Sequence, residues 1–219
     1  MVLNDHSKCL SIALKRSAYL QDGAQTMPWE RQFNRSEVLD KAMQTFWSRG
    51  YAATSMQDLV DRMGINRGSL YSTFGDKHEL FLAALCMFDE RVRQQLLAKL
   101  AAEYPPREAI RQLFVTFLSQ ATQEDGNRGC LLTNTALELA AHDPEAASIV
   151  ASAQEQIEEF FRSQIEAGIA GRDIVTEVPV QELARGFLAT LLGLMVLIRS
   201  RPDPSLLQSI VDDAMRRLG

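Results

Sequence analysis

The chain has 219 residues, of which 46% are hydrophobic and 23% charged, and its formal net charge is −5. This is an ordinary globular balance with enough apolar material for a core, and the acidic total is unfavourable for a general polyanion binder. The acid is unevenly distributed: residues 81–219 hold 13 basic against 19 acidic residues, whereas residues 34–80 hold six of each. The N-terminal part is therefore free of the acidic excess.

The cysteine content and the length of the apolar runs indicate in which cellular compartment the protein is located. Cys9, Cys86 and Cys130 are odd in number and widely spaced, which is unlike a disulfide framework and suits a reducing cytoplasm. Residues 1–26 lack a sufficient apolar core for a secretion signal. The longest apolar run, Gly186–Ile198, is shorter than the roughly 20 residues that span a bilayer. We therefore predict a cytoplasmic protein without a membrane partner.

The first strong helical pattern begins only after residue 34. Residues 1–33 are interpreted as an N-terminal extension, either without a folded role or with one short helix packed on the first bundle. A helix is predicted over residues 35–49 from apolar residues at i, i+3 and i+4 spacing, and Gly50 ends it. Thr54 followed by Gln57 has the form of a capping box, which predicts the start of a second helix.

A helix-turn-helix pattern follows. The second helix ends at Gly64, and Asn66 can cap a third, short helix over residues 67–74 that Gly75 closes. In a helix-turn-helix, the second of two helices joined by such a turn lies in the major groove of DNA. The alternative is that three short helices simply form a bundle.

The short helix has few apolar residues and many polar ones. Leu70 and Phe74 lie four apart and anchor it inward. A glycine inside a helix costs about 1 kcal/mol relative to alanine, so Gly68 suggests close approach to a groove. Lys77 lies on the first turn of the next helix, where backbone N–H groups favour an anion, and Thr54 can hold a phosphate from the other side. The predicted DNA-contacting residues are Thr54, Asn66, Arg67, Gly68, Ser69, Tyr71, Ser72, Thr73 and Lys77.

The remaining chain is also helical, so the predicted fold class is all-α. Asp76 and Glu79 form another capping pair, which starts a long helix that continues to about residue 102. Strand-like alternation occurs only briefly at Asp173–Val180, where Pro179 argues against a strand. Five more helices are predicted over residues 107–122, 130–141, 144–170, 179–200 and 205–218.

Residues 35–81 resemble a known DNA-binding domain. They contain F-x-x-x-G-Y-x-x-T-S and then L-x-x-x-x-G-I-x-x-G-S-L-Y-x-x-F-G-x-K, and in this they are similar to the N-terminal domain of TetR/AcrR-type transcriptional regulators. Thr73 and His78 depart from the family pattern, which affects the expected operator sequence and not the activity. The resemblance implies DNA contacts at the matching positions Thr54, Arg67, Gly68, Ser69, Tyr71 and Lys77.

The resemblance also implies a helix-turn-helix domain over residues 34–80 and a ligand-binding and dimerisation domain over residues 81–219. The sequence agrees, because the helix over residues 179–200 is apolar almost all round and one face can meet a partner. The alternative is that the last two helices are core helices of a monomer. The residues predicted at a homodimer interface are Leu188, Leu192, Leu207, Ile210, Val211 and Ala214.

A ligand pocket is predicted between the helices of the C-terminal part. Phe and Met at helical spacing are more often plain core, and that alternative stays open. Cys130 could be a redox or electrophile sensor near a helix N-terminus, although a buried small apolar residue is the favoured interpretation. The candidate ligand-binding residues are Met87, Phe88, Phe114, Phe117, Cys130, Asn134, Glu138, Phe161 and Met195.

Enzyme motifs are missing from the sequence: it has no phosphate-binding glycine loop, no HExxH and no CxxC. We expect no catalytic residue, metal or cofactor. The predicted function is a homodimeric regulator, with a repressor favoured, that binds a palindromic double-stranded DNA operator and is released by a partly apolar small-molecule inducer. The alternative is a helical small-molecule-binding module or enzyme that keeps the three-helix motif only as a scaffold.

Overall fold

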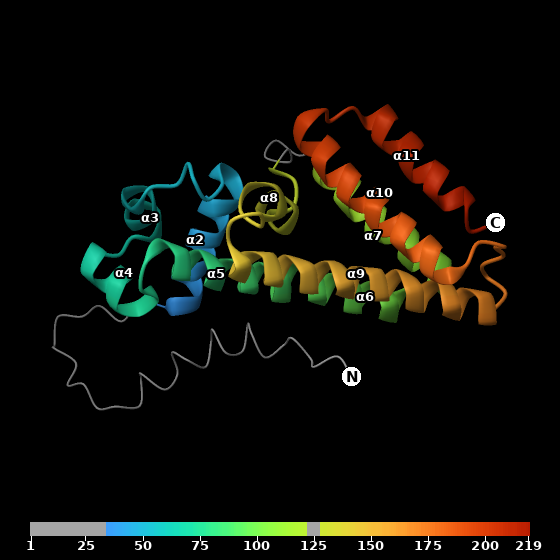
Figure 1. The fold of residues 1–219 in the computed structure, drawn as a ribbon, viewed down its shortest axis with the longest axis horizontal. Helices are drawn as coiled ribbons and strands as arrows, with labels where there is room; N and C mark the ends of the chain where they lie inside the picture. Colours follow the sequence, from blue (N-terminus) through green and yellow to red (C-terminus); the bar gives the residue numbers. More distant parts are fainter. Residues whose placement is uncertain (1–33, 122–127) are drawn as a thin grey trace.

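The computed structural model describes residues 34–121 and 128–219, and every regular element within them is helical. The predicted all-α class is therefore confirmed, and Asp173–Val180 forms no strand. The interpretation of residues 1–33 lies outside the described residues. Three short helices gather at one end of an elongated molecule, and two long helical segments run from there to a helical bundle at the other end (Figure 1).

The three short helices have the predicted ends. They are α2 (Arg35–Arg49), α3 (Met56–Met63) and α4 (Arg67–Phe74). Each is followed by a glycine with positive φ, which is 86° at Gly50, 72° at Gly64 and 79° at Gly75. Residues with a side chain rarely adopt such a backbone, so the glycines allow the chain to leave each helix sharply.

The cap of α3 differs from the prediction by one residue. Ser55, not Thr54, is the N-cap: its hydroxyl accepts from the Asp58 N–H at 3.1 Å, and Asp58 Oδ2 accepts from the Ser55 N–H at 2.9 Å. Ser55-x-x-Asp58 is a second capping frame that overlaps Thr54-x-x-Gln57. The hydrogen bonds from Ser55 and the guanidinium of Arg49 lower the pKa of the Asp58 carboxyl to about 2.

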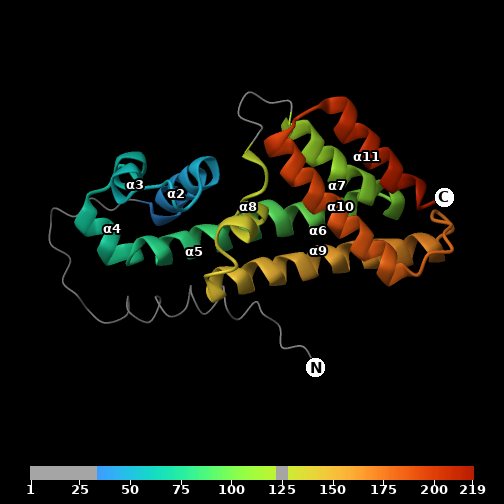
Figure 2. The same cartoon turned by 45° about the horizontal axis from the view of Figure 1, so that its top comes forward.

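The predicted long helix is one continuous rod with an irregular middle. It consists of α5 (Lys77–Phe88), the π-helical segment η2 (Asp89–Gln94) and α6 (Gln95–Glu103). The predicted Asp76–Glu79 capping box at its start is confirmed. Figure 2 shows the rod beside the long helix α9 (Pro144–Ala170).

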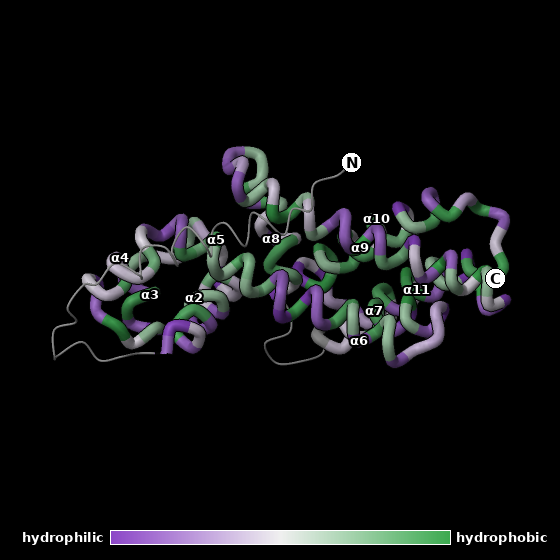
Figure 3. Tube along the Cα trace, turned by 90° about the horizontal axis from the view of Figure 1, so that it is seen from below, coloured by the Kyte–Doolittle hydropathy of each residue, from purple (hydrophilic) through white to green (hydrophobic). Residues whose placement is uncertain are grey.

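The other helices of the C-terminal part lie close to their predicted positions. They are α7 (Pro106–Ala121), α8 (Leu131–Glu138), α10 (Val180–Ser200) and α11 (Pro204–Arg216). Helix α8 ends three residues earlier than predicted and continues as a turn. Polar and apolar residues alternate along the helices, as amphipathic packing requires (Figure 3).

By length and composition alone, α10 could cross a membrane. The apolar run within it predicts a shorter segment, but the helix has 21 residues. It packs against α7, α9 and α11. The core helix of a soluble protein can have the same length and apolar composition. Its buried residues are Leu183, Ala184, Phe187, Leu191, Leu194, Met195 and Ile198. We interpret α10 as a core helix on this ground.

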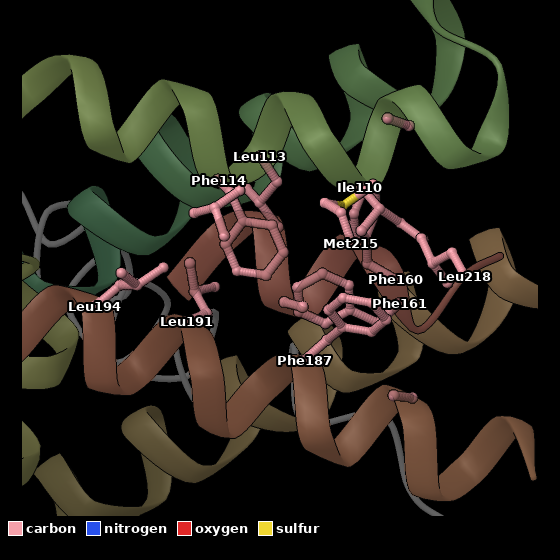
Figure 4. Close-up of a cluster of buried hydrophobic side chains, with 14 of the residues drawn as sticks. Ile110, Leu113, Phe114, Phe160, Phe161, Phe187, Leu191, Leu194, Met215 and Leu218 are labelled. Atoms are coloured by element: carbon pink, nitrogen blue, oxygen red, sulfur yellow. The ribbon is translucent and has the colours of Figure 1, made fainter. Parts of the chain in front are cut away.

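The buried apolar residues form two clusters. The C-terminal core joins α6, α7, α9, α10 and α11 around the rings of Phe114, Phe161 and Phe187, whose centroids lie 5.4–5.9 Å apart (Figure 4). The N-terminal core joins α2, α3, α4 and α5 with α8 and the start of α9. The helix-turn-helix unit therefore shares its core with helices from the predicted C-terminal domain.

Candidate nucleic-acid interface

Helix α4 is held by two residues and presents its remaining surface outward. Leu70 and Phe74 are both 0% exposed, as the spacing predicts. Gly68 is exposed, and an added Cβ would lie 3.3 Å from Oδ1 of Asn66, which is a tight contact with the side chain that caps the helix. Of the predicted contact residues on or next to α4, Asn66, Arg67, Gly68, Tyr71 and Ser72 are exposed, and Ser69, Thr73 and Lys77 are half-buried.

Two of these side chains also organise α4 itself. Asn66 caps the helix, because its Oδ1 accepts from the Ser69 N–H at 2.7 Å. The Ser72 hydroxyl donates to the Ser69 carbonyl at 3.1 Å. Arg67, by contrast, makes no hydrogen bond or ion pair with another residue of the described part of the chain. It is the side chain best placed to reach an outside partner.

The ammonium group of Lys77 lies over the aromatic ring of Tyr51. Its Nζ lies 4.3 Å from the ring centroid of Tyr51, within cation–π range. That ring in turn packs 5.0 Å from Phe81 and 6.2 Å from Phe46. Burial, followed by the charges of Asp76 and Asp143, raises the pKa of the Tyr51 phenol, which keeps it neutral. Lys77 is therefore fixed on the first turn of α5, beside the backbone N–H groups of that turn.

Thr54 lies differently from the other predicted contacts. It is 1% exposed, and its hydroxyl donates to the Gly50 carbonyl at 2.6 Å. A phosphate contact through Thr54 stays a prediction, and this geometry is unfavourable for it. Ser55 is exposed next to it at the N-terminus of α3, where an anion would meet free backbone N–H groups.

His78, where the sequence departs from the TetR/AcrR pattern, links the interface to α9. Its Nε2 lies 2.6 Å from Oδ2 of Asp143, the N-cap of α9, and its Nδ1 lies 4.0 Å from Glu145 Oε2. Burial raises the pKa of the Asp143 carboxyl, but the N–H of Ala146 and the imidazole of His78 hold it below its usual value.

The His78→Gln variant is expected to be less stable than the wild type at neutral pH and to lose less stability in acid. A carboxylate whose pKa is lowered by folding stabilises the fold at pH values above its pKa in the unfolded chain, which is about 3.9. This stabilisation is lost as the pH falls through its pKa in the folded protein. The two stability curves should converge in acid, where Asp143 is protonated. Urea unfolding at a series of pH values measures this. His142→Gln, at an exposed position, is the control, and parallel curves for wild type and His78→Gln would contradict the expectation.

The predicted dimer residues divide into two groups. Leu207, Val211 and Ala214 are at most 3% exposed and belong to the chain's own core. Their place at a dimer interface stays a prediction, and this burial is unfavourable for it. Leu188, Leu192 and Ile210 are half-buried. Sequence reasoning missed the exposed small and apolar residues of α10, which are Ala189, Gly193 and Val196. They follow each other at helical spacing next to Leu192.

The predicted ligand residues are divided between the two cores. Phe88 lies in the N-terminal core, with Met87 packed against it, whereas Phe114, Phe161 and Met195 lie in the C-terminal core. Phe117 packs against that core from a half-buried position, and Asn134 donates to the Arg128 carbonyl at 2.9 Å. A cleft of about 400 Å³ between α10 and α11 has none of them in its lining.

Cys130 and Glu138, two polar ligand candidates, lie in different surroundings. Cys130 is half-buried, and burial raises the pKa of its thiol despite the opposing N–H groups at the start of α8. A raised thiol pKa disfavours the reactive thiolate. Glu138 was expected beside the ligand, but it is exposed and its carboxylate accepts from the N–H groups of Tyr51 and Ala52. Helix α8 ends at Glu138, and this carboxylate faces the turn between α2 and α3. A ligand contact through Glu138 stays a prediction.

A buried ion pair in η2 was not predicted. Asp89 and Arg93 are each 6% exposed and bonded in a bidentate way. Gln94 Nε2 donates to Asp89 Oδ2 at 2.9 Å, and Arg93 Nη2 donates to Gln156 Oε1 of α9 at 3.2 Å. An Asp and an Arg four apart in a long helix usually form a surface pair, so the sequence contains no signal of this burial.

Comparisons with known proteins agree with this geometry. Residues 38–84 match the sequence profile described as bacterial regulatory proteins, tetR family, and residues 106–213 match that of the tetracyclin repressor-like C-terminal domain. YezE of Bacillus subtilis, an uncharacterized HTH-type transcriptional regulator, is 31% identical over 183 residues, which are 83% of this chain and 94% of YezE. The transcriptional repressor ComR of Escherichia coli is 28% identical over 84% of this chain and 88% of ComR.

Solved structures of TetR family regulators are also similar to this chain. A cysteine variant of the TetR family regulator CifR, in complex with a 26-bp operator duplex, superposes with a TM-score of 0.77 at 28% identity. The match covers 89% of this chain and all of that chain. A TetR family regulator from Cytophaga hutchinsonii has the same fold, with a TM-score of 0.73 at 20% identity. The exposed face of α4 thus occurs in a fold that a relative uses on operator DNA.

Proposed function

Because the chain belongs to the TetR family and is a DNA-binding transcriptional regulator rather than an enzyme, we propose that it is a cytoplasmic, homodimeric repressor released from its operator by a small molecule. The observation that carries the DNA-binding part is α4, which has two buried anchors and, at its leading end, the exposed residues Arg67 and Gly68. Such a helix can enter a major groove with its N-terminal residues against base edges.

The proposed roles of the contact residues differ. Arg67 reads a base, because its planar guanidinium can bond guanine in a bidentate way. Lys77 binds a phosphate, supported by the Tyr51 ring below it and by the first-turn N–H groups beside it. Tyr71, 48% exposed, offers its hydroxyl to the backbone of the DNA. Phosphate contacts position the motif, and base contacts specify the sequence.

Dimerisation follows from the needs of operator recognition. One recognition helix makes few base contacts, and two of them about one helical turn of DNA apart, roughly 34–36 Å, read a near-palindrome. The outward residues of α10 support a partner there, because Ala189, Leu192, Gly193 and Val196 form a face of small and apolar groups. An added Cβ at Gly193 meets nothing within 4 Å, which leaves room for a second helix to approach closely.

The ligand response is the part of the proposal that depends on the C-terminal domain. The rod from α5 to α6 starts at Lys77 and ends in the C-terminal core. A partly apolar molecule that binds two states of this domain with different affinity would shift the rod and the spacing of the two recognition helices. The buried aromatic residues Phe114, Phe161 and Phe187 make an apolar inducer the favoured class.

The test of this function is operator binding by two single variants. Arg67→Ala should lose about 1–3 kcal/mol of binding to the selected operator and lose preference at one base pair. Lys77→Ala should weaken binding to all sequences alike and reduce the salt slope by about one. The measurement is a salt-titrated gel shift on DNA selected from a random pool, with sedimentation to show that the bound species contains two 24.5-kDa chains.

Arg201→Ala is the matched control, because Arg201 is an exposed arginine just beyond α10, at the other end of the chain. It should bind like the wild type. If Arg67→Ala and Lys77→Ala also bind like the wild type, the three-helix unit is only a scaffold, and the alternative of a small-molecule-binding module is correct.

A further inference from the structure

Helix α8 ends in a contact with the helix-turn-helix unit. The Glu138 carboxylate accepts from two successive backbone N–H groups, at 3.1 Å from Tyr51 and 2.7 Å from Ala52. Both amides lie in the turn between α2 and α3, where helix hydrogen bonds do not satisfy them. The residues in contact are more than 80 positions apart in the chain, so this contact ties two distant segments together.

Gly50 makes room for this carboxylate. A Cβ at position 50 would lie 3.0 Å from Glu138 Oε2 and 3.4 Å from Oε1, which is closer than packing normally allows. The positive φ of 86° also favours glycine here. A residue with a side chain at position 50 would therefore crowd the Glu138 carboxylate.

The turn is connected to the proposed phosphate-binding residue. The N–H of Tyr51 is bonded by Glu138, and its ring lies under the Nζ of Lys77. The same ring packs on Phe81 of α5. Tyr51 therefore connects Glu138 with Lys77, and a displacement of Glu138 would change the position of the ring that contacts Lys77.

Helix α8 is fixed to the same unit at its other end. The Trp47 indole of α2 donates to the Gly129 carbonyl at 3.0 Å, two residues before α8 begins. Between the two contacts, Leu131 and Leu132 lie in the core shared with α2 and α5. Helix α8 thus contacts the end of α2 through Trp47 and the following turn through Tyr51.

We propose that Glu138 is a positioning residue for operator recognition, through which α8 fixes the angle of the helix-turn-helix unit on the C-terminal domain. In the dimer, this angle sets the distance between the two recognition helices. The inference rests on the proposed function, in which two such units bind one operator. It adds a direct path from α8 to the DNA-binding unit that does not pass along the α5–α6 rod.

The test compares Glu138→Gln with Glu155→Gln in the full-length protein. Both remove one negative charge, and Glu155 is exposed on α9. The glutamine at 138 keeps one acceptor but turns an NH₂ group toward the second backbone N–H. Binding is measured to the selected operator and to operators with two base pairs inserted or removed between the half-sites, which rotates one half-site by roughly 70°. Hydrogen exchange of the peptide over residues 50–54 is measured in parallel.

The expected result is a loss of spacing selectivity. The ratio of affinities for the selected and altered spacings should fall at least about fivefold in Glu138→Gln, the lower end of usual coupling between sites. Protection of residues 50–54 should fall too, with the melting temperature close to that of Glu155→Gln. A Glu138→Gln protein with the spacing ratio of Glu155→Gln would overturn the inference. A wild type that selects no DNA sequence would overturn the proposed function itself.

Discussion

Replacing Phe74 by alanine is expected to lower the free energy of unfolding by about 3–5 kcal/mol and to abolish operator binding. Phe74 is 0% exposed, and with Leu70 it is one of two buried residues in the eight-residue helix α4. The Arg35 guanidinium lies 5.5 Å from its ring centroid and loses that contact as well. A helix of this length is not stable without its tertiary anchors, so the recognition surface should lose its order.

Urea unfolding and a gel shift on the selected operator measure the two effects. Leu137→Ala is the control, since Leu137 is a large apolar residue that is 73% exposed and its truncation should change stability by less than about 0.5 kcal/mol. If Phe74→Ala retains the stability and the operator affinity of the wild type, α4 is held in another way.

Replacing Arg93 by methionine is expected to cost about 3–5 kcal/mol of stability, because Asp89 is left buried without its counter-charge. The double variant Asp89→Leu/Arg93→Met should be close to the wild type, since removing both charges also removes their desolvation cost. With the single variant Asp89→Leu and the wild type, these proteins form a double-mutant cycle that urea unfolding can evaluate. Equal losses in the single and the double variant would show that the pair contributes packing and not charge neutralisation.

The exposed pair of Arg216 and Asp213 provides a contrast. Its atoms lie 2.8 Å apart, but the two side chains are 70% and 60% exposed. Surface pairs contribute about 0–1 kcal/mol, so Arg216→Met should be nearly neutral. The difference between the two arginines isolates the effect of burial.

Local sequence signals predicted the framework of the DNA-binding unit. Gly50, Gly64 and Gly75 end helices because they adopt backbone conformations that other residues avoid, and this depends on neighbouring residues alone. The Asp76–Glu79 box is local for the same reason. Where two local frames overlapped, at Thr54 and Ser55, the burial of the Thr54 side chain decided between them.

The features that sequence reasoning missed depend on distant partners. The π-helical segment places Arg93 against Gln156, 63 positions further along the chain. Glu138 lies beside other polar residues in the sequence, which suggested a ligand, and only the fold shows its partners to be backbone amides at Tyr51 and Ala52. Helix α4 could be predicted as a DNA-reading helix from its own residues and from the resemblance of residues 35–81. A ligand pocket, by contrast, would depend on how several helices of the C-terminal part pack together.

The shared N-terminal core has a consequence for engineering. A chimera that transfers only residues 34–80 to another protein would cut the chain inside α5. The transferred helix-turn-helix unit would lose its core residues Phe81, Leu85 and Phe88. It would also lack the α8 residues Leu131 and Leu132, which close the same core. A variant with a new DNA specificity should therefore exchange outward residues of α4 within this chain. The helix-turn-helix unit shares its hydrophobic core with α8 and α9 and is not a separable domain.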